Sequence, residues 1–322
     1  MHTRARRELI MAQIRKALIF GAASISGISL TKELRDAGYI VTGADIKENV
    51  DRSAFDNYHV CDITDAKQVE FVMAKANPTH IFDLVDGRSF ATWKKPQYGF
   101  LINEIGAINI FEAAKNFLLK PRILLAGSSE EYGEANRPLF EGDMLNPNTP
   151  YGLAKAVQEK LAEVYRNKYH LDIFCVRQFD ILGVGFNRHS VVDLWCEVAA
   201  GIKKGTYRPV MYVGDLNVYR DYLDIRDLVS AYRMIIESSN SEEIYNVGYG
   251  ISYTLKEILD YIISLTGMEI RIDVDPKIVK KKADENKIVK CDHSKITKSL
   301  GWEPQHVIFD TIRQIYESYL VD

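Results

Sequence analysis

A tyrosine and a lysine lie four residues apart in the stretch TPYGLAKAVQEKLAEVY (residues 149–165), where the apolar spacing predicts a helix. Side chains at this spacing share one helix face, so we expect Tyr151 and Lys155 to be neighbours. A free phenol has a pKa of about 10 and exchanges protons poorly at neutral pH. A neighbouring ammonium favours the phenolate and lowers that pKa. The pair is therefore suited to moving a proton at an alcohol or ketone oxygen.

A serine hydroxyl is predicted in the same pocket. The apolar run RILLAGS (122–128) predicts a fifth strand that ends at Ser128 and Ser129. Open α/β sheets bind ligands at the carboxyl ends of their strands, and a hydroxyl there can bond the same substrate oxygen as Tyr151. Because Tyr-x-x-x-Lys alone is frequent by chance, this interpretation depends on the other motifs and on their order along the chain.

A glycine turn precedes the first predicted helix. Gly21, Ser24 and Gly27, in GAASISG, follow the predicted strand KALIF (16–20). Glycines at such a turn permit close approach of the backbone to a pyrophosphate, which then rests on the helix N-terminus. Ser24 adds a Cβ at the middle position, and its hydroxyl is able to donate to a phosphate oxygen. Turns of this composition also occur incidentally, so the turn by itself does not establish a dinucleotide site.

Acidic residues end the next two predicted strands. Asp45 closes YIVTGAD (39–45), at about the distance from the glycine turn where a carboxylate accepts ribose hydroxyls. Since that carboxylate would repel a 2′-phosphate, Asp45 favours NAD(H) over NADP(H), although Lys47 weakens the preference. Alternatively, Asp45 is a solvated residue at the end of its strand and contacts no ribose. Asp62, ending YHVCD (58–62), is placed to reach the adenine amino group or to cap the helix that follows.

A dinucleotide gives the tyrosine and lysine a shared task. The positive charge of an oxidised nicotinamide would add to that of Lys155 in favouring the Tyr151 phenolate, and Lys155 would also hold the nicotinamide ribose. A proton would then move at an alcohol or ketone while a hydride moves at its carbon.

The order of elements predicts an α/β protein with a Rossmann-type doubly wound parallel sheet. Short apolar runs, among them HIFDLV (80–85) and LDIFCVR (171–177), alternate with amphipathic stretches such as ISLTKELRDAG (28–38) and NIFEAAKNFL (109–118). The strands are almost continuously apolar, which suits a sheet covered on both faces.

After Arg177 the alternation breaks, and a smaller, mostly C-terminal α/β lobe that binds the substrate is predicted. A helix and a strand within 226–249 are expected to return to the first sheet. The predicted organisation is an N-terminal arm, a dinucleotide-binding domain with its returning segment, and a substrate-binding lobe in two pieces: 1–16; 17–178 with 226–249; 179–225 and 250–322.

Composition excludes several classes of protein. A formal net charge of −3 and the lack of a basic stripe give no reason to expect nucleic acid. No apolar run is long enough to cross a bilayer, and the basic N-terminus lacks the features of a secretory signal. Four scattered cysteines form neither a metal-binding pair nor a disulfide framework, which fits a reducing cytoplasm; no metal site is expected.

From Ala17 onward the chain resembles the extended short-chain dehydrogenase/reductase family, which comprises nucleotide-sugar epimerases, dehydratases and reductases. Within it, the spacing around HSVVDLWCEVAAGIKKG and VGDLNVYRDYLDIRDLV is most similar to GDP-4-keto-6-deoxymannose reductases and GDP-mannose 4,6-dehydratases. The other stretches that carry the resemblance are FGAASISG, LINEIGAINIFEAAK, LLAGSSEEYG, PNTPYGLAKAVQEKLAEVY, VRQFDILGVG, IYNVGYG and KSLGWEP.

The resemblance implies roles for particular residues. Ser128, Tyr151 and Lys155 match the family's catalytic hydroxyl, tyrosine and lysine. Glu130 falls where dehydratases keep an acid/base, but some similar reductases also carry a glutamate there, so it does not settle the reaction. Arg220 matches an arginine that clamps the substrate diphosphate, a task that suits a fork of donors. The cofactor contacts implied are Gly21, Ser24, Ile25, Gly27, Asp45, Asp62, Ile63, Leu84, Tyr151 and Lys155. The substrate contacts implied are Asp180, Asn187, Arg220 and Lys282.

The chain also departs from the family pattern. Asp180 replaces the usual asparagine, which puts an extra carboxylate near a diphosphate, and Lys282 replaces a second diphosphate arginine. Asp86 and Arg88 stand near the expected nicotinamide in place of small residues. These departures bear on which substrate the protein binds more than on its fold.

The leading hypothesis is an NAD(H)-dependent enzyme acting at C4 of a nucleotide-activated hexose, with NADP(H) not excluded. In the reductase version, of GDP-sugar type, a C4 ketone accepts a hydride while Tyr151 delivers the proton. In the dehydratase version the C4 hydride is taken up, Glu130 helps to expel water, and the hydride returns at C6. A 4-epimerase returns the hydride to the opposite face of C4.

The alternative of another class is a protein that binds a dinucleotide without turnover, suggested by the departures at Ser24, Asp86 and Asp180. The intact Ser128, Tyr151 and Lys155 argue against it. The resemblance further implies a homodimer, formed through a four-helix interface of QYGFLINEIGAINIFEAAKNF and AVQEKLAEVYRNKY.

Overall fold

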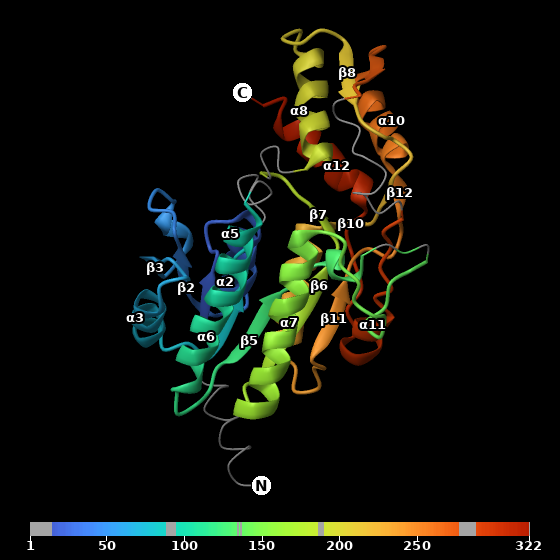
Figure 1. Ribbon diagram of the computed structural model, residues 1–322. Helices are drawn as coiled ribbons and strands as arrows, with labels where there is room; N and C mark the ends of the chain where they lie inside the picture. Colours follow the sequence, from blue (N-terminus) through green and yellow to red (C-terminus); the bar gives the residue numbers. More distant parts are fainter. Residues whose placement is uncertain are drawn as a thin grey trace. The chain divides into compact units, whose positions relative to one another are not determined.

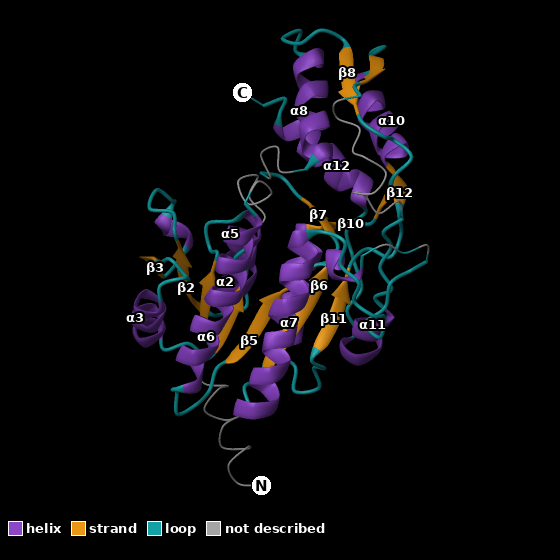
Figure 2. Ribbon diagram, in the orientation of Figure 1, coloured by secondary structure: helices purple, strands orange, loops and turns teal. Residues whose placement is uncertain are grey.

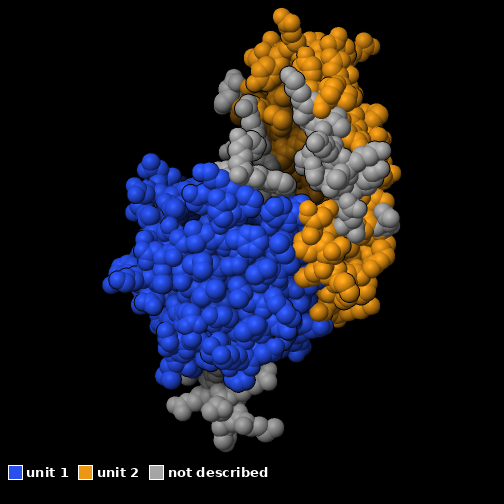
Figure 3. All heavy atoms as spheres, viewed as in Figure 1, with its two compact units in different colours: residues 1–131, 149–177, 229–245 blue, residues 132–148, 178–228, 246–322 orange. Residues whose placement is uncertain are grey.

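The computed structural model describes residues 15–87, 95–133, 135, 137–185, 190–276 and 288–321. The chain divides into two compact units (Figure 3). Unit 1 comprises residues 1–131, 149–177 and 229–245, and unit 2 comprises residues 132–148, 178–228 and 246–322. The four cysteines are buried and unpaired. No helix of the described residues is long and apolar enough to span a membrane.

A seven-stranded sheet of order β11-β6-β5-β4-β1-β2-β3 forms the centre of unit 1 (Figure 1). The pairings from β3 through β2, β1, β4 and β5 to β6 are parallel. The chain runs outward from β1 in both directions, which is the doubly wound arrangement predicted from the sequence. The strands are β1 (Lys16–Phe20), β2 (Ile40–Asp45), β3 (Asn57–Val60), β4 (His80–Asp83), β5 (Arg122–Ala126), β6 (Ile173–Gln178) and β11 (Ile244–Val247).

Helices cover this sheet, and Figure 2 shows α7 running along its strands. Buried side chains of α3, α6 and α7 pack with those of the strands into one apolar core, including Phe20, Ile81 and Phe111. On α2 and α9, Glu33 and Arg233 form an ion pair at 2.6 Å. The helical segments are α2 (Ile25–Asp36), η1 (Arg52–Ala54), α3 (Ala66–Ala76), α5 (Pro96–Phe100), the π-helical η2 (Leu101–Ile105), α6 (Gly106–Lys115), η3 (Ser129–Tyr132), α7 (Pro150–Tyr169) and α9 (Ile225–Glu237).

The predicted strands are all present, but three of them end earlier than the sequence suggested, among them β4, which ends at Asp83 instead of Val85. β5 ends at Ala126, so Ser128 lies two residues beyond the strand, just before η3. β3 ends at Val60, so Asp62 likewise lies in a loop. Cys61 follows β3, Leu84 and Val85 follow β4, and the small residues Gly127 and Ser128 follow β5, which is why the composition alone extends the strands too far. The returning helix and strand are α9 and β11, and β11 forms the edge of the sheet.

Unit 2 has a separate apolar core, built from α8, α10, α12 and short strands, which includes Trp195, Ile258 and Ile312. Its helices begin with side-chain caps where the sequence supplies them: Thr254 and Glu257 form a capping box on α10. The elements are β7 (Asp180–Leu182), α8 (Val191–Lys203), β8 (Val210–Val213), β9 (Tyr219–Arg220), β10 (Tyr222–Asp224), β12 (Tyr253–Thr254), α10 (Leu255–Thr266), β13 (Arg271–Val274), α11 (Ser294–Leu300) and α12 (Ile308–Ser318).

Candidate active site

The glycine turn between β1 and α2 has little room for side chains. Gly21 adopts a φ of +79°, and a Cβ at Gly27 would lie 2.5 Å from the Gly21 carbonyl oxygen. Ser24 caps α2: its hydroxyl accepts the Gly27 N–H at 3.0 Å and donates to the Gly21 carbonyl at 2.7 Å. Ile25 is the first residue of that helix. Ser24 therefore holds the turn in shape, a local reason for a serine at the middle position of the motif.

Asp45 lies against this turn. One of its carboxylate oxygens accepts the Ala23 N–H at 2.9 Å, and the other accepts the Lys47 N–H at 3.1 Å. The Lys47 ammonium donates to the Ala23 carbonyl at 3.3 Å. A glycine cradle at a helix N-terminus with a carboxylate beside it matches the donor and acceptor set of a dinucleotide, so the residues present fit such a cofactor.

The loops after β3 and β4 contain the remaining predicted cofactor contacts. Asp62 accepts the N–H and hydroxyl of Thr64 at 2.9 and 2.8 Å, while Asp65 provides the N-cap of α3. The capping role considered for Asp62 therefore belongs to Asp65. Ile63 is buried against α6, where a Cβ on Gly106 would overlap its side chain. Leu84 is buried, and its carbonyl group borders the glycine turn at 3.0 Å from a Cβ placed on Gly21.

Tyr151 and Lys155 lie on the first turns of α7, as predicted. Lys155 is 2% exposed, and its ammonium donates to the Ala126 carbonyl at 2.8 Å and to Gln158 Oε1 at 3.2 Å. The Tyr151 hydroxyl donates to Asp86 Oδ2 at 3.3 Å, so a carboxylate lies beside the phenolic proton. Asp86 thus belongs to the site, although the sequence marked it only as a departure from the family.

Ser128 and Glu130 lie beside the same helix. The Glu130 N–H donates to Ser128 Oγ at 3.1 Å, and a Glu130 carboxylate oxygen accepts the Thr149 hydroxyl at 2.8 Å. Thr149 is also the N-cap of α7, since its side chain accepts the Gly152 N–H at 2.9 Å. The start of α7 therefore places Glu130 near Tyr151, and all four predicted catalytic residues belong to unit 1.

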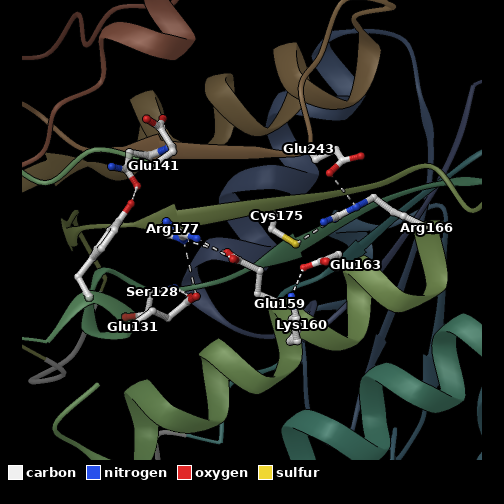
Figure 4. A network of polar contacts seen from close by, with 12 residues as sticks. Ser128, Glu131, Glu141, Glu159, Lys160, Glu163, Arg166, Cys175, Arg177 and Glu243 are labelled. Atoms are coloured by element: carbon white, nitrogen blue, oxygen red, sulfur yellow. Dashed lines mark hydrogen bonds and ion pairs between the residues drawn. The ribbon is translucent and has the colours of Figure 1, made fainter. Parts of the chain in front are cut away.

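A buried carboxyl that the sequence analysis did not select holds the backbone of Ser128. Glu131 is 0% exposed, and its Oε1 accepts the Ser128 N–H at 2.7 Å (Figure 4). Arg177 lies 3.8 Å from its Oε2 but forms its short bonds, of 2.6 and 2.9 Å, with Glu159. Burial, and then the charge of Glu159, raise the pKa of Glu131. The adjacent acids in SSEEYG were the only signal for it in the sequence.

Two further carboxyls near Lys155 were also missed. Asp83, at the end of β4, is 1% exposed, and burial raises its pKa to about 6. Glu104 lies in the π-helical η2, and burial raises its pKa to about 7. In both cases the Lys155 charge opposes the shift. Nothing in the periodicity of either stretch marks an acid as functional.

In unit 2, Arg220 and Asp180 form an ion pair, with Arg220 Nε 3.6 Å from Asp180 Oδ2. The parallel pairing of β7 with β10 brings these segments together. The next residue, Asp221, is fully buried and accepts the N–H groups of Tyr249, Gly250 and Cys291 at 2.8 to 2.9 Å. Burial raises the pKa of Asp221 to about 7. Asn187 and Lys282, the other predicted substrate contacts, and Arg88 lie outside the described residues.

Known proteins resemble this chain along most of its length. GDP-6-deoxy-D-mannose reductase of Pseudomonas aeruginosa is 26% identical over 230 residues, which cover 70% of this chain and 75% of that protein. UDP-glucose 4-epimerase of Lacticaseibacillus casei is 26% identical over 319 residues, covering 93% and 94% of the two chains. The structure of RMD from Pseudomonas aeruginosa complexed with NADPH has a TM-score of 0.82 at 22% identity, covering 95% and 99%.

These findings confirm the resemblance and the Rossmann-type fold predicted from the sequence. The model of a family described as the NAD dependent epimerase/dehydratase family matches residues 17–248, which is well over half of the chain. The protein therefore belongs to the NAD dependent epimerase/dehydratase family.

Proposed function

We propose that this protein transfers a hydride at C4 of a nucleotide-activated hexose, using a nicotinamide dinucleotide bound at the glycine turn. The observation that supports this most is the grouping of Ser128, Glu130, Tyr151 and Lys155 at the start of α7, in the same unit as the glycine turn. When bound, the nicotinamide supplies or accepts the hydride. We further propose residues 17–178 and 226–249 as the dinucleotide domain, and 179–225 and 250–322 as the substrate lobe.

Each catalytic side chain has a distinct task in this proposal. Tyr151 gives a proton to, or takes one from, the C4 oxygen, and Ser128 holds that oxygen through its hydroxyl. Lys155 positions the cofactor ribose and supplies a positive charge beside the phenol. Asp86 accepts the Tyr151 hydroxyl, at 3.3 Å, and so provides a path for the proton to leave the phenol.

The finer activity we propose first is reduction of a 4-keto-6-deoxy sugar linked to GDP. The similarity to a GDP-6-deoxy-D-mannose reductase supports it. The UDP-glucose 4-epimerase relative supports 4-epimerisation to the same degree. A 4,6-dehydratase is supported by Glu130, whose carboxylate is held at the helix start that bears Tyr151.

Product analysis separates these activities. The purified protein is incubated with NADH and GDP-4-keto-6-deoxymannose, and separately with NAD⁺ and GDP-mannose or UDP-glucose, and the sugars are identified by NMR. A reductase consumes one NADH per sugar, whereas a dehydratase or an epimerase changes the sugar with no net change in the cofactor. Dinucleotide binding with no altered sugar in any incubation would favour the binding protein without turnover.

We propose NAD(H) as the preferred cofactor because the Asp45 carboxylate lies at the glycine turn, where a 2′-phosphate would be repelled. NADP(H) should bind at least about tenfold more weakly in titrations. Equal affinities would contradict the assignment of Asp45 to the ribose hydroxyls.

We also propose a homodimer through α5, α6 and α7. Tyr98, Leu101 and Ile105 follow helical spacing along one stretch, Leu153 and Val164 lie three turns apart on α7, and all five are exposed. Light scattering on the purified protein should give twice the mass of the chain. A monomer at micromolar concentration would contradict this proposal.

A further inference from the structure

Three acidic side chains of unit 1 have buried carboxylate oxygens without a hydrogen-bond donor. Asp83 Oδ2, Glu131 Oε2 and both carboxylate oxygens of Glu104 accept no hydrogen bond among the described residues. Asp83 and Glu131 are almost completely buried, at 1% and 0% exposure. We call these three residues the buried acid group. Buried polar atoms are normally paired, and those that are not often mark a missing ion, water or catalytic partner.

The cations nearby are already engaged. Lys155, whose charge acts on all three acids, donates to the Ala126 and Val85 carbonyls and to Gln158, at 2.8, 3.5 and 3.2 Å. Arg177 binds Glu159 through two bonds and lies 3.8 Å from Glu131. The described residues therefore leave the buried acid group short of positive charge. Among the described residues, the charged and titratable groups that act on it are Lys155 and Glu159 on α7 and Arg177 and Cys175 on β6. Asp86, after β4, lies beside Tyr151 on α7.

Asp83 and Glu131 adjoin candidate cofactor and catalytic residues, and the Lys155 charge acts on Glu104. Asp83 directly precedes Leu84, whose carbonyl group borders the glycine turn at 3.0 Å from a Cβ placed on Gly21. Glu131 holds the Ser128 N–H at 2.7 Å. No group of three metal-ligating side chains is found in the part of the chain that the structure describes, so these acids do not converge on a metal ion.

We infer that the buried acid group makes the site bind the oxidised, positively charged nicotinamide more tightly than the reduced, neutral one, with release of protons as the oxidised form binds. The inference rests on the proposed function, since it requires a nicotinamide at this site. A cation near a buried carboxyl favours its ionised form, so the carboxyl loses its proton when the cation arrives. The neutral nicotinamide ring of NADH does not favour the ionised carboxyl, so its binding releases no proton.

Proton release and affinity are linked. Burial holds the pKa values of Asp83 and Glu104 at about 6 and about 7 and raises that of Glu131, so the acids are partly protonated near neutral pH. If binding of NAD⁺ releases protons, its affinity rises with pH, whereas the affinity of NADH stays nearly constant. The buried carboxyls titrate as a coupled set, so the number of protons released belongs to the group rather than to one residue.

This preference bears on the choice between the proposed activities. A reductase must release NAD⁺ in every turnover, and tight binding of NAD⁺ slows that release. An epimerase or a dehydratase keeps its cofactor and begins by oxidising the sugar, so it benefits from a site that holds NAD⁺. On this ground the buried acid group supports 4-epimerisation or 4,6-dehydration against the reduction that the similarity to a reductase supports, and product analysis decides between them.

Calorimetric titration of the full-length protein with NAD⁺ and with NADH tests the inference. Titrations at pH 6, 7 and 8, in two buffers of different ionisation enthalpy, give affinities and the number of protons released. At pH 7 we expect about half a proton to one proton released with NAD⁺ and none with NADH. The ratio of NAD⁺ to NADH affinity should rise about tenfold from pH 6 to pH 8.

Two isosteric variants and a control show whether the buried acid group causes the preference for NAD⁺. Glu104→Gln and Asp83→Asn should each lower the ratio of NAD⁺ to NADH affinity at pH 8 by about three- to tenfold and reduce proton release. Glu70→Gln, at an exposed glutamate on α3, should change neither. If Asp83→Asn does not fold, Glu104→Gln and the unmodified protein still decide the question.

Two results would overturn the inference, and only the second would also overturn the proposed function. If both forms bind but their affinity ratio does not change with pH, the inference is wrong and the proposed function stands. If neither NAD⁺ nor NADH binds at millimolar concentration, the proposed function fails and the inference fails with it.

Discussion

At the scale of single residues, the candidate site combines groups that the sequence marks with groups that it does not. Tyr151, Lys155 and Ser128 follow from spacing and from position in the predicted sheet. Glu131 and Glu104 could not be predicted, because what distinguishes them is carboxylate oxygens buried without a hydrogen-bond donor, and burial of a polar residue leaves no trace in a hydrophobic pattern. Their adjacent residues are ordinary for a loop and a helix.

The ion pair of Arg220 with Asp180 explains how an extra carboxylate is tolerated where a diphosphate is expected. In the unbound protein the carboxylate offsets the guanidinium charge, at an Nε–Oδ2 distance of 3.6 Å. A diphosphate would have to compete with Asp180 for Arg220 and would be repelled by it.

We therefore expect opposite effects from two substitutions in this pair. Arg220→Ala should weaken nucleotide-sugar binding by about 2 to 4 kcal/mol, because the desolvated charge of the diphosphate would lose its partner. Asp180→Asn should tighten that binding by a few fold. Isothermal titration with the nucleotide sugar and with NAD⁺ checks both effects, with Arg271→Ala on β13 as the matched control. An equal loss of both ligands in Arg220→Ala would indicate a structural role instead.

At the scale of elements, the positions of strands and helices are predictable and their ends are less so. The run RILLAGS resembles one strand, yet the strand ends at Ala126, and after a last bond from the Gly127 N–H to the Val176 carbonyl the chain enters the loop that carries Ser128. Strand ends depend on where hydrogen-bond partners run out, which is a property of the neighbouring strands. The start of α2, in contrast, follows from the sequence, because Ser24 caps a helix that Gly27 allows to pack closely.

The packing at Gly27 gives a prediction about the glycine turn. In Gly27→Ala the new methyl would lie 2.5 Å from the Gly21 carbonyl oxygen and 2.6 Å from that of Ala22, so the turn or the helix must shift. We expect a loss of about 1 to 3 kcal/mol in the free energy of unfolding and at least tenfold weaker NAD⁺ binding. Ser29→Ala, further along α2, is the control and should preserve both. Unchanged NAD⁺ affinity in Gly27→Ala would show that the turn does not hold the cofactor.

At the scale of the whole molecule, burial favours the protonated form of several carboxyls. Burial raises the pKa values of Asp83, Glu104 and Asp221 to about 6, 7 and 7, and that of Glu131 also rises. The unfolded chain ionises these groups near pH 4, so between pH 4 and their folded values the native state binds more protons. Stability from these groups is therefore present at low pH and is lost as the pH rises through neutrality.

The stability of the protein without ligands should accordingly fall with rising pH. Buried His80, whose pKa burial lowers to about 3, opposes this trend only below about pH 6.5, where the unfolded histidine takes up a proton. Between pH 6.5 and pH 8 we expect the free energy of unfolding to drop by about 1 to 2 kcal/mol, measured by urea denaturation. Glu104→Gln should reduce the slope. A stability that rises over this interval would contradict the protonation states inferred here.

The central claim is that Tyr151 carries the proton while a hydride moves, and single-turnover hydride transfer tests it most directly. The enzyme is preloaded with cofactor and mixed with the nucleotide sugar that product analysis identifies, and the nicotinamide absorbance is followed at several pH values. Tyr151→Phe keeps the ring but removes the hydroxyl, so the rate should fall by about 10²- to 10⁴-fold while cofactor and substrate still bind. Lys155→Met should lose cofactor affinity as well as rate, and Tyr169→Phe, at the far end of α7, should behave like the unmodified protein. A Tyr151→Phe variant that transfers hydride at close to the unmodified rate would show that Tyr151 is not the acid/base.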